Sequence, residues 1–187
     1  LSEWVEAHVV LPSTIAASPG RMRLFPYQRE MADAMGDPTI ERVTVLKGAR
    51  IGYTQLAVAA LAHYASNDPA PVLGVLPAEA DAKQLMTGSV EPTFRESPTL
   101  ADLLSADAYG RDTMLSRQFP GGSLKLVSAN SPRNLRALTA RVLILDELDG
   151  WEIDARGEGD PLTLAEKRTL TFSDRKIIAG STPVDEE

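Results

Sequence analysis

Short, nearly unbroken apolar runs recur along this sequence and constrain its fold more than any other feature. Runs of Val, Ile and Leu without polar alternation are typical of strands that are covered on both faces, as in a parallel sheet. Helix-like stretches separate the runs, which implies right-handed crossovers between successive strands. The expected strands are Val43–Leu46, Val72–Leu76, Leu124–Val127, Val142–Leu145 and Lys176–Ala179. The pattern predicts an α/β fold, a three-layer sandwich with a mainly parallel central sheet.

Three segments between these runs are expected to be helical. Thr54–Ala65 is apolar almost all round, which indicates a helix that packs directly against the sheet. Ala78–Met86 and Leu162–Phe172 have the composition of helices that lie over it. We therefore expect helices to alternate with the strands along most of the chain.

Composition limits the classes of site. The 187 residues suffice for one domain with a hydrophobic core. Because there are no cysteines, and His8 and His63 lie far apart in sequence, thiolate sites are excluded and a histidine-built zinc site is not expected. The formal net charge of −7 argues against a surface coated with nucleic acid but leaves room for a local basic track.

No segment of the sequence has the pattern of a membrane span or a signal peptide. The longest apolar runs are too short to cross a bilayer, and the opening "LSEWVEAHVV" lacks the signal-peptide pattern. The chain opens without methionine and ends at "STPVDEE", so we expect an excised domain of a longer protein.

The segment "KGARIGYT", Lys47–Thr54, has the context of a phosphate-binding loop, since it follows an expected strand and opens an expected helix. Gly48 and Gly52 allow the backbone to turn several N–H groups toward an anion. The start of the helix adds its positive dipole end. Thr54 falls at the Ser/Thr position of the motif G-x-x-x-x-G-K-[ST], where a hydroxyl binds the Mg²⁺ that bridges phosphate oxygens.

The loop departs from the motif at one position. Tyr53 stands where the lysine belongs, and a tyrosine cannot neutralise a phosphate. Lys47, at the end of the preceding strand, is long enough to reach back over the loop toward the β- and γ-phosphates. Arg50 is the alternative source of that charge, and a chance coincidence of glycines is the alternative to the motif as a whole.

Polar side chains also follow two other expected strands. Asp146 and Glu147 come directly after an apolar strand, at the carboxyl end where ligands bind in open α/β sheets. There Asp146 would hold Mg²⁺ and Glu147 would accept a proton from the attacking water, although the pair is also compatible with a simple acidic turn. Ser181 and Thr182 follow the last strand, where their hydroxyls could sense a γ-phosphate by hydrogen bonding. Together with the loop, these residues predict a nucleotide hydrolase.

An aromatic and a glutamine precede the first strand. The ring of Tyr27 could stack on adenine, and the amide of Gln28 could both donate to and accept from its edge. The alternative is that Phe25 and Tyr27 are core or staple residues at the start of a helix.

The motifs resemble those of the large subunit of tailed-bacteriophage terminase, a DNA-packaging motor, and specifically its lambda-like branch. "KGARIGYT" resembles that branch's variant Walker A loop, in which the lysine moves to the front, "DELDGW" resembles the Walker B segment with its catalytic glutamate, and "GSTP" resembles the coupling motif. The resemblance extends over almost the whole chain through the segments "VLPAEADAKQLM", "VEPTFRESP" and "GDPLTLAEKRT".

The resemblance implies a P-loop NTPase of the additional-strand catalytic-glutamate (ASCE) class, with ATP and Mg²⁺ as its nucleotide and metal. It makes Glu147 the general base, Lys47 the phosphate-binding lysine and Arg50 an arginine offered to phosphate or to a neighbouring subunit. Thr54 and Asp146 become Mg²⁺ partners. The remaining ATP-binding residues are Gly48, Ala49, Ile51, Gly52, Tyr53, Tyr27 and Gln28, and the coupling residues are Ser181 and Thr182.

The resemblance also implies partners and a division of the chain. It predicts a homo-oligomeric ring on the portal of a procapsid, a terminase small subunit, double-stranded DNA as the cargo, no membrane, and the host cytoplasm as the location. The isolated domain is expected to be a monomer. Residues 1–40 would form a helical, adenine-binding segment and residues 41–187 the ATPase core, without the carboxyl-terminal nuclease. The alternatives are a helicase-like nucleic-acid-dependent ATPase and a P-loop assembly module that does not hydrolyse ATP.

Overall fold

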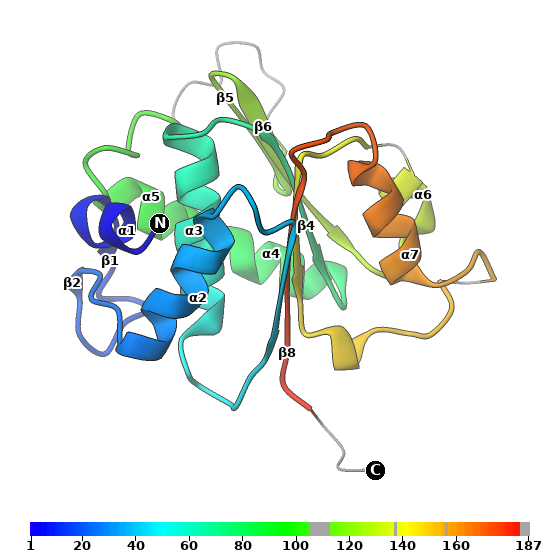
Figure 1. The fold of residues 1–187 in the computed structure, drawn as a ribbon, viewed down its shortest axis with the longest axis horizontal. Helices are drawn as coiled ribbons and strands as arrows, with labels where there is room; N and C mark the ends of the chain where they lie inside the picture. Colours follow the sequence, from blue (N-terminus) through cyan, green and yellow to red (C-terminus); the bar gives the residue numbers. More distant parts are fainter. Residues whose placement is uncertain (105–112, 137, 156, 184–187) are drawn as a thin grey trace.

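The computed structural model describes residues 1–104, 113–136, 138–155 and 157–183 of the chain. Within these residues a six-stranded sheet runs through the molecule, with helices on both of its faces (Figure 1). Its strands are β3 (Arg42–Leu46), β4 (Pro71–Leu76), β5 (Ser116–Phe119), β6 (Gly122–Ser128), β7 (Val142–Asp146) and β8 (Lys176–Ser181).

The strand order in the described sheet is β3-β8-β7-β4-β6-β5. Every neighbouring pair is parallel except β5 and β6, which are antiparallel. This confirms the expected α/β fold with a mainly parallel sheet. The strand β8 lies between β3 and β7, so it is an additional strand between the strand before the loop and the strand that ends in Asp146.

Helices cover the two faces unequally (Figure 1). The larger hydrophobic core lies on one face of the sheet. A smaller hydrophobic core, which includes Leu135 and Ala165, lies on the other face. The first face has α1 (Ser2–His8), α2 (Pro26–Gly36), α3 (Tyr53–Ser66), α4 (Glu79–Leu85), the π-turn η1 (Met86–Val90) and α5 (Glu91–Glu96), and the second has α6 (Pro132–Arg136) and α7 (Pro161–Glu166). None of the described helices combines the length and apolarity that crossing a bilayer would require.

The amino-terminal residues are anchored to the sheet by a buried lysine. They form α1, a small antiparallel pair of β1 (Val10–Leu11) and β2 (Gly20–Arg21), and α2. The amine of Lys176, at the start of β8, donates to the carbonyl oxygens of Asp37 at 2.6 Å and of Ile40, just beyond the end of α2. This contact fixes the end of α2 against the central sheet.

Two expectations are wrong in detail. The strand β3, expected to be covered on both faces, lies at the edge of the sheet with only Val45 of its residues buried, and Leu46 is 79% exposed. The helix expected at Leu162–Phe172 is α-helical only as far as Glu166 and continues as the 3₁₀ turn η3 (Lys167–Thr169). There the Thr169 hydroxyl donates to the Glu166 carbonyl oxygen at 2.8 Å, a local bond that competes with a regular helix.

A tyrosine packs directly on the backbone of β8. The Tyr53 side chain is buried beside Gly180, where an added Cβ would lie 2.3 Å from the Tyr53 Cζ. No real Cβ approaches an aromatic ring so closely, so the strand needs glycine at this position.

We expect Gly180→Ala to lower the free energy of unfolding by about 1–3 kcal/mol, because the new methyl group displaces a buried ring. Urea denaturation measures the change. Gly88→Ala is the matched control, since its nearest neighbouring atom lies 3.9 Å from an added Cβ. Equal stability of the Gly180→Ala variant and the unmodified chain would contradict this packing.

Candidate active site

The carboxyl ends of three adjacent strands meet at one edge of the sheet. In the parallel register, Leu46 of β3 lies beside Ser181 of β8, and Gly180 of β8 lies beside Asp146 of β7. The segments that follow these strands are the loop before α3, the acidic pair and the Ser-Thr pair. The structure thus brings together groups that are about 100 and 135 residues apart, such as Lys47 with Glu147 and with Thr182.

The left-handed backbone conformation occurs at two positions of the loop between β3 and α3, of which only one is a glycine. Gly52 has φ +80° and caps α3, while Arg50 has φ +62° and is exposed. The loop surrounds an open groove of about 370 Å³. The groove is lined by Lys47, Gly48, Ala49, Arg50, Ile51, Gly52, Tyr53, Thr54, Gln55, Glu147 and Thr182.

The Lys47 side chain turns inward, toward the acidic pair. Its amine lies 2.6 Å from Glu147 Oε1 and 3.5 Å from Asp146 Oδ1, and it donates to the Thr182 hydroxyl at 3.3 Å. Only 6% of the side chain is exposed. A buried ammonium requires such partners, because the loss of hydration is otherwise too costly. Lys47 is also among the residues that line the groove.

Asp146 and Thr54 form the pair expected to hold a metal. The Thr54 hydroxyl donates to Asp146 Oδ2 at 3.1 Å, and the Glu147 N–H donates to Asp146 Oδ1 at 3.0 Å. Burial raises the pKa of the Asp146 carboxyl, an effect that outweighs the opposing influence of the Lys47 charge. A carboxylate and a hydroxyl are hard oxygen donors, so this pair fits Mg²⁺, which is typically held by one or two protein oxygens with waters and phosphates.

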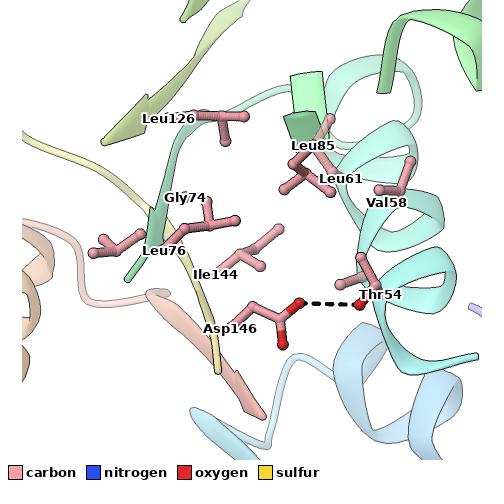
Figure 2. Close-up of a pocket in the computed structure, with 11 residues that line it drawn as sticks. Thr54, Val58, Leu61, Gly74, Leu76, Leu85, Leu126, Ile144 and Asp146 are labelled. Carbon is pink, nitrogen blue, oxygen red and sulfur yellow. Dashed lines mark hydrogen bonds between the residues drawn. The ribbon is translucent and has the colours of Figure 1, made fainter. Parts of the chain in front are cut away.

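Figure 2 shows this hydrogen bond at one end of an apolar cavity between α3 and the sheet. Val58 and Leu61 line it from the helix, and Gly74 and Ile144 from the strands. The cavity holds about 20 Å³, room for little more than one water molecule. A nucleotide therefore does not fit in this cavity, whereas the open groove along the loop has room for its phosphates.

Glu147 is held in an unusual backbone conformation. Its φ of +51° lies in the left-handed region, which costs a residue other than glycine of the order of 1–3 kcal/mol. Besides its contact with Lys47, its carboxylate accepts from the Thr182 N–H at 3.4 Å. The side chain is 47% exposed, so water can reach it, as a general base requires.

The residues after β8 connect this strand to the acidic turn. The Ser181 hydroxyl accepts from the Asp149 N–H at 2.9 Å, and the Ser181 carbonyl accepts from the Lys47 N–H at 3.0 Å. With the Thr182 contacts, these bonds link the end of β8 to both the loop and the candidate base. Residues that couple hydrolysis to motion require such a connection to the phosphate loop and the base.

Tyr27 and Gln28 lie against the loop, but the Gln28 amide is already engaged. Its Nε2 donates to the Ile51 carbonyl at 2.9 Å, and its Oε1 accepts from the Phe25 N–H at 3.0 Å. The Tyr27 hydroxyl donates to the same Ile51 carbonyl at 3.2 Å. Gln28 therefore braces the loop. Phe25 and Tyr27 stack at 5.8 Å between centroids and are both exposed, so they offer an aromatic surface beside the groove.

Sequence reasoning missed two residues of the site. Trp151 donates its indole N–H to the Asp146 carbonyl oxygen at 3.1 Å, which fixes the turn after β7. Gln55 lies one residue after Thr54, and its buried Oε1 has no hydrogen-bond partner among the described residues. The tryptophan closes the acidic segment "DELDGW", which was a usable signal, whereas nothing in the sequence marked Gln55.

This fold and site define a P-loop nucleoside triphosphatase domain whose additional strand lies between the loop strand and the acidic strand. The model of the family described as "Phage terminase large subunit gpA, ATPase domain" matches residues 16–187. The chain belongs to this family, whose members are ATP hydrolases.

Relatives and solved structures agree with this assignment. The chain is 33% identical to the terminase large subunit of Escherichia phage lambda and 31% identical to that of Enterobacteria phage P21, over 97% of this chain in both cases. It spans only 29% of the length of each of these relatives. The fold is similar to the HK97 bacteriophage large terminase, with a TM-score of 0.75 and 16% identity over 96% of this chain and 36% of that one.

A second fold match is the large terminase ATPase domain of Thermus phage P74-26. The TM-score is 0.55 and the identity 21%, over 84% of this chain and 65% of that one. At these identities the solved structures support the fold alone.

In the absence of metal, we expect Asp146→Asn to be at least as stable as the unmodified chain at pH 7. Below an unfolded Asp pKa of about 3.9 the carboxyl is protonated in both states, so it costs the fold nothing. Because the folded pKa is raised, a destabilising cost develops as the pH rises past that value and is complete above the folded pKa. Urea denaturation in EDTA from pH 7 toward pH 4 should therefore show an advantage of the variant that shrinks as the pH falls. A variant clearly less stable at pH 7 would contradict the cost of burying this charge.

Proposed function

We propose that this chain is the ATP-hydrolysing motor domain of a terminase large subunit, which uses ATP and Mg²⁺ to drive double-stranded DNA into a procapsid. The observation that supports this most strongly is the cluster of Lys47, Asp146 and Glu147 at adjacent strand ends, beside a loop that opens a helix. The family match favours the terminase over a helicase-like ATPase or an assembly module that does not hydrolyse ATP.

In the proposed reaction, the β- and γ-phosphates lie along the groove of the loop. The loop N–H groups and the amino-terminal end of α3 favour their negative charge. Lys47 adds a mobile positive charge, Arg50 is the second cation offered by the loop, and the exposed ring of Tyr27 offers a surface for adenine. Thr54 and Asp146 would hold Mg²⁺, which neutralises charge on the phosphate oxygens when bound.

Glu147 would act as the general base. Its carboxylate takes a proton from water as the oxygen attacks the γ-phosphorus in line, the bond from this phosphorus to the bridging oxygen breaks, and ADP leaves. The Lys47 ammonium, 2.6 Å from Glu147 Oε1, occupies an oxygen that the attacking water would need as its hydrogen-bond acceptor. We infer that Lys47 leaves Glu147 for the phosphates when ATP binds, which frees the base only when substrate is present.

The partners and the division of the chain are also part of this proposal. We infer a homo-oligomeric ring on the portal, a small-subunit partner and a location in the host cytoplasm, with a monomeric isolated domain.

Residues 1–40 would form the adenine-binding segment and residues 41–187 the ATPase core, the last four residues of which lie outside the described part of the chain. The contacts of Tyr27 and Gln28 with the Ile51 carbonyl support a role of the amino-terminal segment at the loop. Ser181 and Thr182 would pass the change at the base to the rest of the motor.

We expect Glu147→Gln to retain Mg²⁺-dependent ATP binding and to lose turnover by about 100-fold or more, because the amide cannot accept the proton. Phosphate release measures turnover, and a fluorescent ATP analogue measures binding. Glu152→Gln is the control, since this exposed carboxylate accepts from Asn130 and lies outside the groove. Turnover of the Glu147 variant at the level of the unmodified chain would exclude it as the base.

Lys47→Ala should behave differently, because it removes the charge that we assign to the phosphates. We expect this variant to lose nucleotide affinity as well as turnover in the same two assays. Unchanged affinity would contradict phosphate binding by Lys47 and would favour Arg50 as the phosphate-binding residue.

A further inference from the structure

We propose that Tyr53 is the positioning residue for Lys47: its ring supports the displaced amine, so that an aromatic at the usual lysine position makes the relocated lysine effective. The inference rests on the proposed function, because it assumes that Lys47 binds phosphate. Tyr53, the residue at which the loop departs from the motif, would thus have a specific structural role.

The first observation is the contact between the two side chains. The Lys47 amine lies over the Tyr53 ring, 5.2 Å from its centroid. This distance is within the range of a cation–π interaction, which is worth more when both groups are removed from water. Lys47 is 6% exposed and Tyr53 is 3% exposed, so both side chains are removed from water.

The second observation is that the ring cannot easily move away. Tyr53 is the first residue of α3, directly after the left-handed Gly52, and its ring packs on Gly180 of β8 with no space for a Cβ between them. The ring is thereby fixed between the loop and the additional strand. A fixed ring can hold the flexible chain of Lys47 near the groove and limit the rotamers that the lysine samples.

The third observation concerns the hydroxyl. It is buried and makes no hydrogen bond within the described residues. With no bond for the hydroxyl to make, the ring face is the part of Tyr53 that contacts a functional group.

The chemistry of the site explains why a ring suits this position. A lysine at position 53 would place a second ammonium beside that of Lys47, and the two would repel each other. A leucine would fill only part of the space and would present no negative face. An aromatic ring fills the space and attracts the cation, and it leaves the ammonium hydrogens free to bind carboxylate or phosphate.

The test is the binding of a fluorescent ATP analogue with Mg²⁺ to variants at position 53. We expect Tyr53→Phe to keep most of the affinity, and Tyr53→Leu to lose it by roughly 30-fold, the size of a desolvated cation–π contact. In a Lys47→Met background, Tyr53→Leu should have little further effect, because the cation that the ring holds is already absent. Equal affinity of the leucine and phenylalanine variants, or the same loss in both backgrounds, would overturn the proposal.

Tyr64→Leu is the matched control. Tyr64 is a buried tyrosine on the same helix, and Arg141 lies over its ring at 5.8 Å, away from the groove. This variant should lose stability but keep the nucleotide affinity. If it lowers affinity as much as Tyr53→Leu does, the effect at position 53 is general loosening of α3 and the proposal is wrong.

A ring of unchanged shape keeps the test decisive if Tyr53→Leu does not fold. Fluorinated phenylalanines at position 53 weaken the negative face of the ring while they preserve the packing on Gly180. Affinity should fall stepwise with fluorination, and constant affinity would overturn the inference. If the unmodified chain binds no nucleotide, the proposed function fails first, whereas binding that is insensitive to the ring defeats only the role of Tyr53.

Discussion

The burial of the Lys47 ammonium at the meeting of three strand ends is the constraint on which the rest of the site depends. Removing this charge from water is costly, and the Glu147 carboxylate, directly after β7, offsets the cost only because β3, β8 and β7 are adjacent and parallel. The same contacts connect the phosphate loop, the candidate base and the end of β8. A nucleotide that attracts the ammonium therefore changes the surroundings of all three at once.

The fold was largely predictable from the sequence, because apolar runs carry the information about a buried parallel sheet. The runs that became β4, β7 and β8 are buried almost throughout, as their lack of alternation indicated. The run that became β3 has the same composition, yet it lies at the edge with Leu46 exposed, since the order of strands is set by tertiary packing. The strand β5 was missed because "SRQF" has no apolar run and pairs through a short turn with β6.

The sequence predicted which residues form the site but not the contacts that they make with one another. Spacing to the strand ends predicted the positions of Lys47, Thr54, Asp146 and Glu147, and the structure brings them together. The spacing could not predict that the Gln28 amide both donates and accepts hydrogen bonds within the chain, because this depends on where the Ile51 carbonyl points. Nor could it predict the contact of Tyr53 with Gly180, which joins residues far apart in the sequence. Motif comparison marks Tyr53 only as a departure, whereas the packing gives it a physical role.

The most direct test of this account is a structure of the chain with Mg²⁺ and a triphosphate that it cannot cleave. We expect the Lys47 amine to move from Glu147 to a β- or γ-phosphate oxygen, with the nucleotide along the loop between β3 and α3. An amine that stays on Glu147 while the nucleotide binds elsewhere would contradict it.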